Sequence, residues 1–182
     1  CRSRALAPRT PAAAVPCADR AACKAACDRS DAKACSQLGT LALHADPVDL
    51  AGAAAAFGKS CDRGYTPGCA SLALQVQDGR GVAWDTARAI QLYQRACDGG
   101  AGIGCFNLAL MYQDGEGVAR DARKSGALLA HALALFTVQC NTEPLWCTNI
   151  GFLYETGMIG GTPDYAKAAA ADHKGCARGD SD

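Results

Sequence analysis

Residues 61–85 read CDRGYTPGCASLALQVQDGRGVAWD, and residues 97–121 read CDGGAGIGCFNLALMYQDGEGVARD. The two segments are identical at 15 of 25 positions, so the chain contains an internal repeat. Weaker copies begin at Cys27 and Cys140, and Cys176 opens another. A spacing of about 36 residues is typical of repeats in which each copy forms two helices.

Each copy predicts two helices joined by a tight turn. After Cys69, Leu72 and Val76 lie on one face of a short first helix. Residues 78–81 contain two glycines, which permit the positive φ of a turn, and Asp85 is a good N-cap for the second helix. A two-helix unit cannot bury its own apolar stripe, so the copies must stack. The sequence therefore predicts an all-α, right-handed superhelical solenoid.

Two recurring sets of residues indicate how the helices pack. An aromatic residue stands four positions before the closing cysteine of three second helices: Phe57, Tyr93 and Phe136. A small residue recurs in every first helix: Gly39, Ala73, Ala109 and Gly151. We expect the small residues to let neighbouring helices approach closely.

The composition excludes several classes of protein. The 182 residues carry 18 basic and 18 acidic side chains, which argues against a nucleic-acid-binding protein. Hydrophobic residues make up 49%, so the chain is not disordered throughout. The most apolar run, residues 127–138, is far shorter than the roughly 20 residues that a membrane-spanning helix needs.

The segment LALMYQDGEGV at residues 108–118, followed by Asp121 and a second helix, resembles Sel1-like repeats, which are relatives of the tetratricopeptide repeats. The paired cysteines resemble the cysteine-rich branch of that family, typified by the Helicobacter cysteine-rich proteins. The resemblance covers about Cys27 to the end. It divides the chain into a tether, a capping helix and four repeats: residues 1–16, 17–28, 33–68, 69–104, 105–146 and 147–182. The first copy lacks the Gly-x-Gly turn, and the third has a longer second helix.

The cysteines predict disulfide bonds at the turns between repeats. Four pairs are separated by eight residues, or seven in the last: Cys27/Cys35, Cys61/Cys69, Cys97/Cys105 and Cys140/Cys147. This spacing does not fit zinc, which prefers closer pairs, and no redox C-x-x-C is present. Cys17 and Cys23 could bond to each other, whereas the partner of Cys176 would lie beyond residue 182.

The first residue suggests a location. The chain begins at Cys1, as a mature bacterial lipoprotein does, and residues 2–16 are rich in Arg, Ala and Pro like an extended tether. We therefore expect a lipid on Cys1 as the only link to a membrane. The array would then lie in the periplasm or on the outer membrane, as a monomer outside the cytoplasm.

A polar position recurs two residues after the second cysteine of each pair: Gln37, Ser71, Asn107 and Asn149. We expect this column on the inner, concave face of the array, with Asn107 and Asn149 facing solvent. Tetratricopeptide relatives use an asparagine at the matching place to hold the backbone of an extended ligand, because an amide both donates and accepts. An apolar floor is expected beside the column: Leu74, Leu110 and Phe152. The resemblance thus implies a non-catalytic scaffold that binds a protein or peptide; the alternative of a preference for polar residues on a helix surface stays open.

Two alternative functions stay open. Residues 30–33 (SDAK) match the S-x-x-K pattern of penicillin-binding enzymes, and Lys124-Ser125-Gly126 resembles K-T-G. Some cysteine-rich Sel1 relatives are described as penicillin-binding with weak β-lactamase activity, so Ser30 and Lys33 are the candidate residues of that reaction. The other alternative is a passive structural spacer.

The remaining motifs favour no further chemistry. Residues 178–181 (RGDS) spell an integrin-type motif, but they occupy the place of the repeat's own turn. The three histidines, His44, His131 and His173, stand apart from one another in the sequence. We therefore predict no metal and no cofactor.

Overall fold

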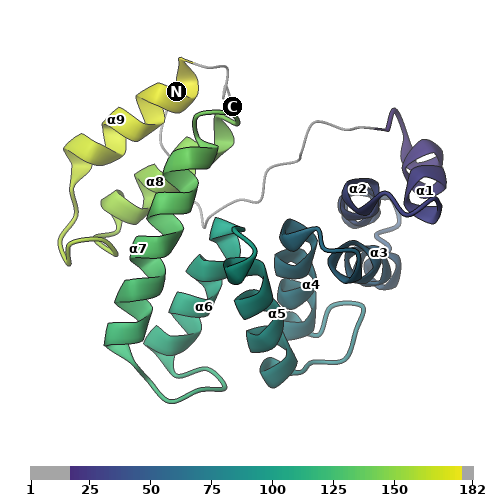
Figure 1. Ribbon diagram of the computed structural model, residues 1–182, viewed down its shortest axis with the longest axis horizontal. Helices are drawn as coiled ribbons and strands as arrows, with labels where there is room; N and C mark the ends of the chain where they lie inside the picture. The colour runs from purple at the N-terminus through teal and green to yellow at the C-terminus, as the bar shows by residue number, and fades with distance from the viewer. Residues whose placement is uncertain (1–16, 178–182) are drawn as a thin grey trace.

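The computed structural model describes residues 17–177, apart from the side chain of Cys176, and these residues form nine α-helices and no strand. The helices follow one another along an arc (Figure 1), which confirms the all-α solenoid. They are α1 (Arg20–Asp28), α2 (Ala32–Leu43), α3 (Leu50–Asp62), α4 (Thr66–Asp78), α5 (Thr86–Asp98), α6 (Gly102–Asp114), α7 (Ala122–Gln139), α8 (Leu145–Glu155) and α9 (Tyr165–Cys176).

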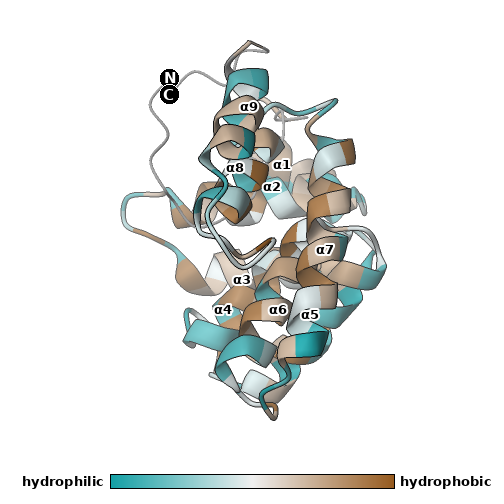
Figure 2. Ribbon diagram, turned by 90° about the vertical axis from the view of Figure 1, so that its left-hand side faces the viewer, coloured by the Kyte–Doolittle hydropathy of each residue, from teal (hydrophilic) through white to brown (hydrophobic). Residues whose placement is uncertain are grey.

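Successive helices pack as hairpins, which stack on one another. The first helix of each hairpin is even-numbered, so that α2 pairs with α3, α4 with α5, α6 with α7 and α8 with α9, while α1 covers the free side of α2. Helices α2 and α4, and likewise α4 and α6, also contact each other directly. The even-numbered helices therefore line the inner side of the arc. Apolar and hydrophilic positions alternate along the helices (Figure 2), as expected for helices that are buried on one side only.

Aspartates begin most of the helices. The side chain of Asp85 accepts a hydrogen bond from the backbone N of Arg88 at the start of α5, as the sequence predicts. The same cap begins α1, α2, α3, α7 and α9. Helices α4 and α6 end at Gly79 and Gly115, whose φ values of 66° and 75° are left-handed. The Gly-x-Gly turn is thus a helix stop that a residue with a Cβ would strain.

The helix boundaries differ from the expected repeat boundaries. Helices α4 and α6 begin at Thr66 and Gly102, three residues before the second cysteine of their pairs. Boundaries drawn at that cysteine cut off most of the first helical turn. The capping helix α1 begins at Arg20 rather than at residue 17, because Asp19 caps it.

Small residues lie where helices touch, at Gly39 of the recurring set and at Gly102 outside that set. Phe57, Tyr93 and Phe136 are buried as expected. A Cβ added at Gly39 would lie 2.6 Å from Cε1 of Phe57, and one at Gly102 would lie 2.7 Å from Cε1 of Phe136. These glycines therefore set the closest distance between a first helix and the aromatic ring of a second helix.

The fit at Gly39 can be tested with a matched glycine. Gly39→Ala should lower the free energy of unfolding by about 1–3 kcal/mol, because the ring of Phe57 must move. Gly126 lies inside α7 with nothing within 4 Å of an added Cβ, so Gly126→Ala should raise it by about 0.5–1 kcal/mol through helix propensity. Urea unfolding monitored by circular dichroism measures both. Changes of the same sign would contradict the proposed close contact.

Gln75 of α4 is a polar residue at a buried position that is apolar in the following repeats. Gln75 is 1% exposed, and its Oε1 has no hydrogen-bond partner among the described residues. The corresponding position is Met111 in the next repeat and Leu153 in the last, both buried. A buried acceptor without a donor is costly, so α4 carries a local defect in its packing.

Replacing this amide should stabilise the protein. Gln75→Met should raise the free energy of unfolding by about 1–2 kcal/mol, because the unpaired carbonyl is removed at nearly constant volume. The control lies two residues further along α4: Gln77 accepts a hydrogen bond from the Tyr93 hydroxyl at 2.8 Å. Gln77→Met should therefore lower stability by about 1 kcal/mol. A loss in both variants would show that the amide of Gln75 is satisfied in solution.

Candidate ligand-binding face

Disulfide bonds close the turns that lead from one hairpin to the next. The structure joins all four predicted pairs, and Cys17 is bonded to Cys23. In the four turns the bonded Cα atoms are 4.5–4.9 Å apart, and every cysteine is buried. Each bond thus fixes the end of one helix against the first turn of the next.

Polar side chains reach back from each odd-numbered helix to the preceding turn. Nη2 of Arg95 donates to the carbonyl of Cys61 at 2.8 Å, and Nζ of Lys174 donates to Oδ1 of Asn141 at 2.8 Å. Lys59 approaches the carboxylate of Asp28, and Gln139 donates to the carbonyl of Gly100. These residues stand one or two positions before a cysteine that closes a repeat. A polar contact back to the preceding turn therefore recurs from repeat to repeat.

The junctions are not equally extensive, which leads to a prediction. Helices α7 and α8 share less contact than α5 and α6. Cys140→Ala with Cys147→Ala should therefore uncouple α8 and α9, with faster hydrogen exchange there than in the other helices. Cys97→Ala with Cys105→Ala should lower stability by about 2.5 kcal/mol on the chain-entropy model but leave a single transition. Equal exchange in both variants would contradict a weaker last junction.

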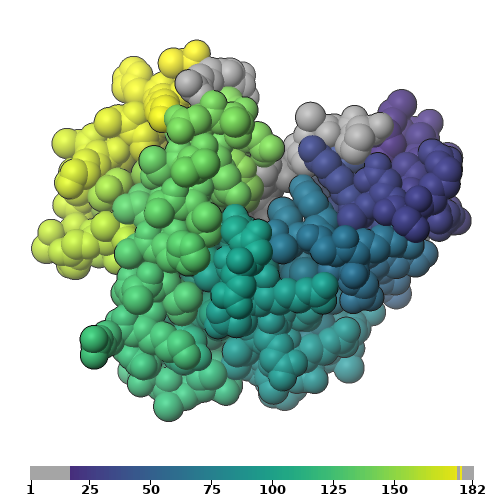
Figure 3. Space-filling view, in the orientation of Figure 1, coloured from purple at the N-terminus to yellow at the C-terminus, as the bar shows by residue number. Residues whose placement is uncertain are grey.

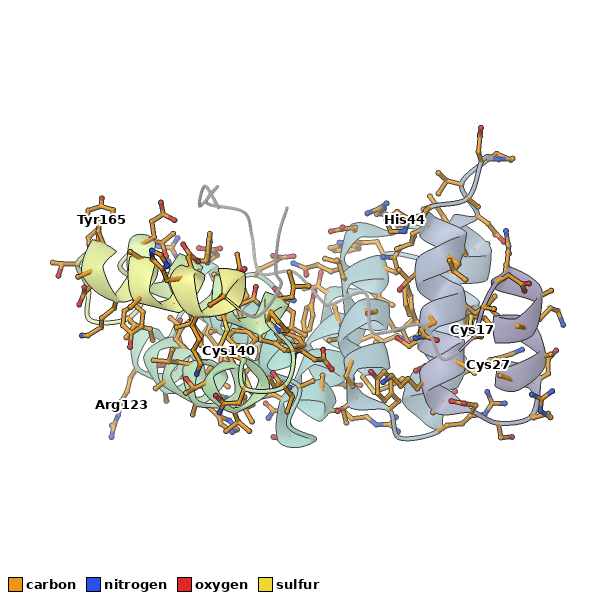
Figure 4. The ribbon with its side chains drawn as sticks, turned by 90° about the horizontal axis from the view of Figure 1, so that it is seen from above. Cys17, Cys27, His44, Arg123, Cys140 and Tyr165 are labelled. Carbon is orange, nitrogen blue, oxygen red and sulfur yellow. A yellow bond between two sulfur atoms is a disulfide. The ribbon has the colours of Figure 1, made fainter. Side chains whose placement is uncertain are left out.

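A cleft lies on the inner side of the arc and is called the inner cleft below. It has a volume of about 300 Å³. Its walls come from α2, from the start of α4 and from the α7–α8 turn: Lys33, Ser36, Gln37, Thr40, Tyr65, Pro67, Ser71, Gln139, Thr142, Glu143 and Trp146. Figure 3 shows the surface hollowed between the arm formed by α1–α3 and the arm formed by α7–α9. Figure 4 shows the same separation from above, with Cys27 in one arm and Cys140 in the other.

The predicted polar column is only partly in this cleft. Gln37 and Ser71 line it, although Gln37 is only 6% exposed and the hydroxyl of Ser71 donates to the Pro67 carbonyl at 3.2 Å. Asn107 is half-buried outside the cleft wall. The expectation that Asn149 faces solvent is wrong, because it is 1% exposed in a helix of which six residues are buried.

The three residues of the predicted apolar floor also differ in their exposure. Leu74 is 42% exposed, but Leu110 and Phe152 pack against the core. The ring of Phe152 meets that of Phe106 edge to face with centroids 6.0 Å apart. None of the three is part of the inner cleft wall.

The two charged residues of the cleft form no salt bridge with the rest of the described chain. Lys33 and Glu143 have no salt bridge within residues 17–177. Oε2 of Glu143 accepts a hydrogen bond from the indole N–H of Trp146 at 3.2 Å. Burial raises the pKa of the half-buried Tyr65 phenol, and the charge of Glu143 adds to the effect. Tyr65 therefore stays a neutral hydrogen-bond donor at neutral pH.

Sequence reasoning missed the residues that make up most of this cleft. Tyr65 and Glu143 both stand four residues before the second cysteine of their pairs, but the other copies have Asp31 and Ala101 there, so no recurring residue type marks the position. The sequence marks Lys33 only through the S-x-x-K match, which does not predict a place in the cleft. Spatial proximity across the arc is the property they share, and a repeat alignment does not contain it.

The S-x-x-K residues do not form a hydrolase-like arrangement with Lys124. Ser30 lies in the α1–α2 turn with a φ of 75°, before the N-cap Asp31. Lys124 begins the opposite arm, in the first turn of α7 (Figure 1). Its Nζ donates to the Tyr112 hydroxyl at 2.6 Å and lies 4.2 Å from the centre of that ring. Lys124 is therefore engaged locally.

One histidine is not isolated in space. Nδ1 of His131 lies 3.7 Å from Sγ of Cys97 and 3.6 Å from Sγ of Cys105. The three ligand atoms lie within 4.8 Å of one another, which is close enough for a metal site. The two sulfurs are bonded to each other, however, and metals bind thiolates rather than disulfides. The imidazole thus serves as a polar contact to the disulfide, as the guanidinium of Arg63 does at Cys35.

Some predicted features lie outside the described residues: Cys1, the tether at residues 1–16, the side chain of Cys176 and the RGDS motif at residues 178–181. Within the described part, none of the helices has the length and apolar character needed to cross a membrane.

The sequence and the fold are similar to known proteins. The Sel1 repeat pattern matches residues 66–100, 102–133 and 147–170, which together make up half of the chain. A protective antigen of uropathogenic Escherichia coli with an SLR fold has a similar structure, with 28% identity and a TM-score of 0.60. A Sel1 repeat protein from Oxalobacter formigenes is similar in fold, with 22% identity and a TM-score of 0.60. Each match covers 88% of this chain but only 33% of the antigen and 55% of the second protein. No curated protein matches the sequence significantly.

Proposed function

Because this chain belongs to the Sel1 repeat family, we propose that it is a non-catalytic scaffold that holds a partner protein or an extended peptide on the inner side of its helical array. Sel1 repeats are typical of protein–protein interaction scaffolds. The observation that carries the proposal is the inner cleft, whose walls come from two hairpins and the α7–α8 turn. A ligand there would contact several repeats at once, which is how solenoids bind extended segments.

The chemistry of the cleft suits a peptide. Its walls present the hydroxyls of Ser36, Thr40 and Ser71, whose oxygens can accept hydrogen bonds from peptide N–H groups. The half-buried Tyr65 adds aromatic surface that can cover an apolar side chain, while Trp146 is only 5% exposed. Its volume is at the lower end of the range of about 300–1,000 Å³ for small-molecule sites. We therefore expect the cleft to hold a short part of a longer ligand.

The disulfides indicate where the scaffold works. Five bonds within 161 residues are typical of an oxidising compartment, such as the periplasm or the cell surface of a bacterium. We propose that the array acts in the cell envelope as a monomer. Attachment through a lipid on Cys1 stays a prediction of the sequence.

A peptide-display selection against the intact protein tests the proposed face. Selected peptides should bind Ser71→Trp at least tenfold more weakly than the unaltered chain, because the indole fills the cleft. Gln91→Trp places the same side chain on an exposed position of α5 outside the cleft, and it should bind normally. Isothermal titration calorimetry measures the affinities.

Three outcomes would contradict the proposal. Peptides that are insensitive to Ser71→Trp would place binding elsewhere. Peptides that are lost with Gln91→Trp would indicate an outer face. A selection that yields no binding peptide would favour the passive spacer.

A further inference from the structure

The inner cleft holds two charged side chains of opposite sign on opposite walls. Lys33 comes from α2, and Glu143 comes from the α7–α8 turn, 110 positions later in the chain. Among the described residues, they are the only charged ones of the cleft wall. Since neither forms a salt bridge within the described residues, each is available to a charged group of opposite sign.

We propose that the inner cleft recognises an extended peptide segment carrying one acidic and one basic side chain, with the acidic group at Lys33 and the basic group at Glu143. The proposal rests on the proposed function and adds the charge pattern of the ligand. Since the cleft is neutral overall, a ligand with a single charge would leave one wall residue unpaired. A segment with both charges pairs with both walls.

The Glu143 wall is suited to a cation. The indole N–H of Trp146 holds one carboxylate oxygen at 3.2 Å, which orients the group without neutralising its charge. The backbone N of Trp146 also donates to the Glu143 carbonyl at 3.2 Å. Glu143 and Trp146 are therefore joined through both their backbones and their side chains. The rings of Trp146 and Phe136 stack with centroids 5.4 Å apart, and this contact anchors the turn to α7. The carboxylate is thus held in place by its own turn.

The Lys33 wall is suited to an anion. Lys33 lies in the first turn of α2, where the Asp31 carboxylate already accepts from the backbone N of Ala34, so an anion of the ligand would be attracted by the Lys33 ammonium group. Ser36, Gln37 and Thr40 follow it on the cleft side of the same helix. The Ser36 hydroxyl can donate to the ligand beside the ammonium group, whereas the Thr40 hydroxyl already donates to the Ser36 carbonyl at 3.3 Å. Acidic side chains are therefore favoured at this end and basic ones at the other.

The expected selectivity is modest, because both charges are exposed. Exposed ion pairs contribute little, so reversing the order of the two charges in a peptide should change its dissociation constant by about threefold to tenfold at low salt. The net charge of the chain is zero, which adds no long-range attraction. The preference should weaken as salt is added.

Trp146 provides a signal for the test. The chain has two tryptophans, and Trp84 is 68% exposed on the α4–α5 loop outside the cleft. Trp84→Phe therefore leaves one tryptophan, in the cleft wall. The probes are acetylated and amidated synthetic peptides with one Glu and one Lys separated by one to five glycines, in both orders. Their affinities are measured from the fluorescence of Trp146 and checked by calorimetry.

The charge exchange gives the decisive comparison. For at least one spacing, the unaltered cleft should prefer one order about threefold to tenfold. Lys33→Met and Glu143→Gln should each reduce that preference, and the double variant Lys33→Glu with Glu143→Lys should reverse it. The control is Asp62→Lys with Arg88→Glu, two exposed residues of α3 and α5 outside the cleft, which should leave the preference unchanged.

Failure of this inference is distinguishable from failure of the proposed function. Equal affinity for both orders at every spacing, no detectable binding of any probe, or a preference that persists in the double exchange would overturn the inference. If the display-selected peptides still lose affinity with Ser71→Trp, the proposed function stands. Circular dichroism of each variant establishes that the helices are intact.

Discussion

The disulfide-closed turn between one hairpin and the next is the constraint on which the structure depends. The helices of residues 17–177 contain between 9 and 18 residues and would be marginal alone, and stacked hairpins contact only their neighbours. The orientation of one hairpin on the next is therefore decided in a short turn. A buried bond across each of the four turns limits the orientations that the unfolded chain can explore.

Two further features hold the array together, one inside the hairpins and one at the turns between them. Glycines such as Gly39 and Gly102 bring one helix directly against an aromatic ring of its neighbour. Side chains such as Arg95 reach back to a carbonyl of the previous turn, which also accepts from the backbone N of Gly64. The hairpins are thus closed by apolar contacts, and covalent and polar contacts coincide at the turns between them. Where the contact is smallest, between α7 and α8, the disulfide contributes relatively more.

The curvature of the array creates the candidate site. Residues of α2 and of the α7–α8 turn are far apart in sequence, yet they face one cleft because the hairpins follow an arc (Figure 1). The cleft is polar, with one charge of each sign and two aromatic side chains. Such a surface complements a chain with both peptide groups and charged side chains, whereas an apolar floor would have favoured a hydrophobic ligand.

The sequence by itself determined the repeat, the two helices of each copy, the aspartate caps and the cysteine pairing, because each is a local pattern repeated at a fixed spacing. It also indicated the close approach at Gly39, since small residues recur opposite recurring aromatic ones. Only the tertiary structure decided which polar residues face the inner side. Asn149 shares its repeat position with Ser71 but is buried, because burial depends on the neighbouring hairpins rather than on the repeat. Lys33 and Glu143 line one cleft for the same reason, because the curvature of the superhelix brings α2 and the α7–α8 turn to the same side. Their spacing along the chain does not predict this proximity.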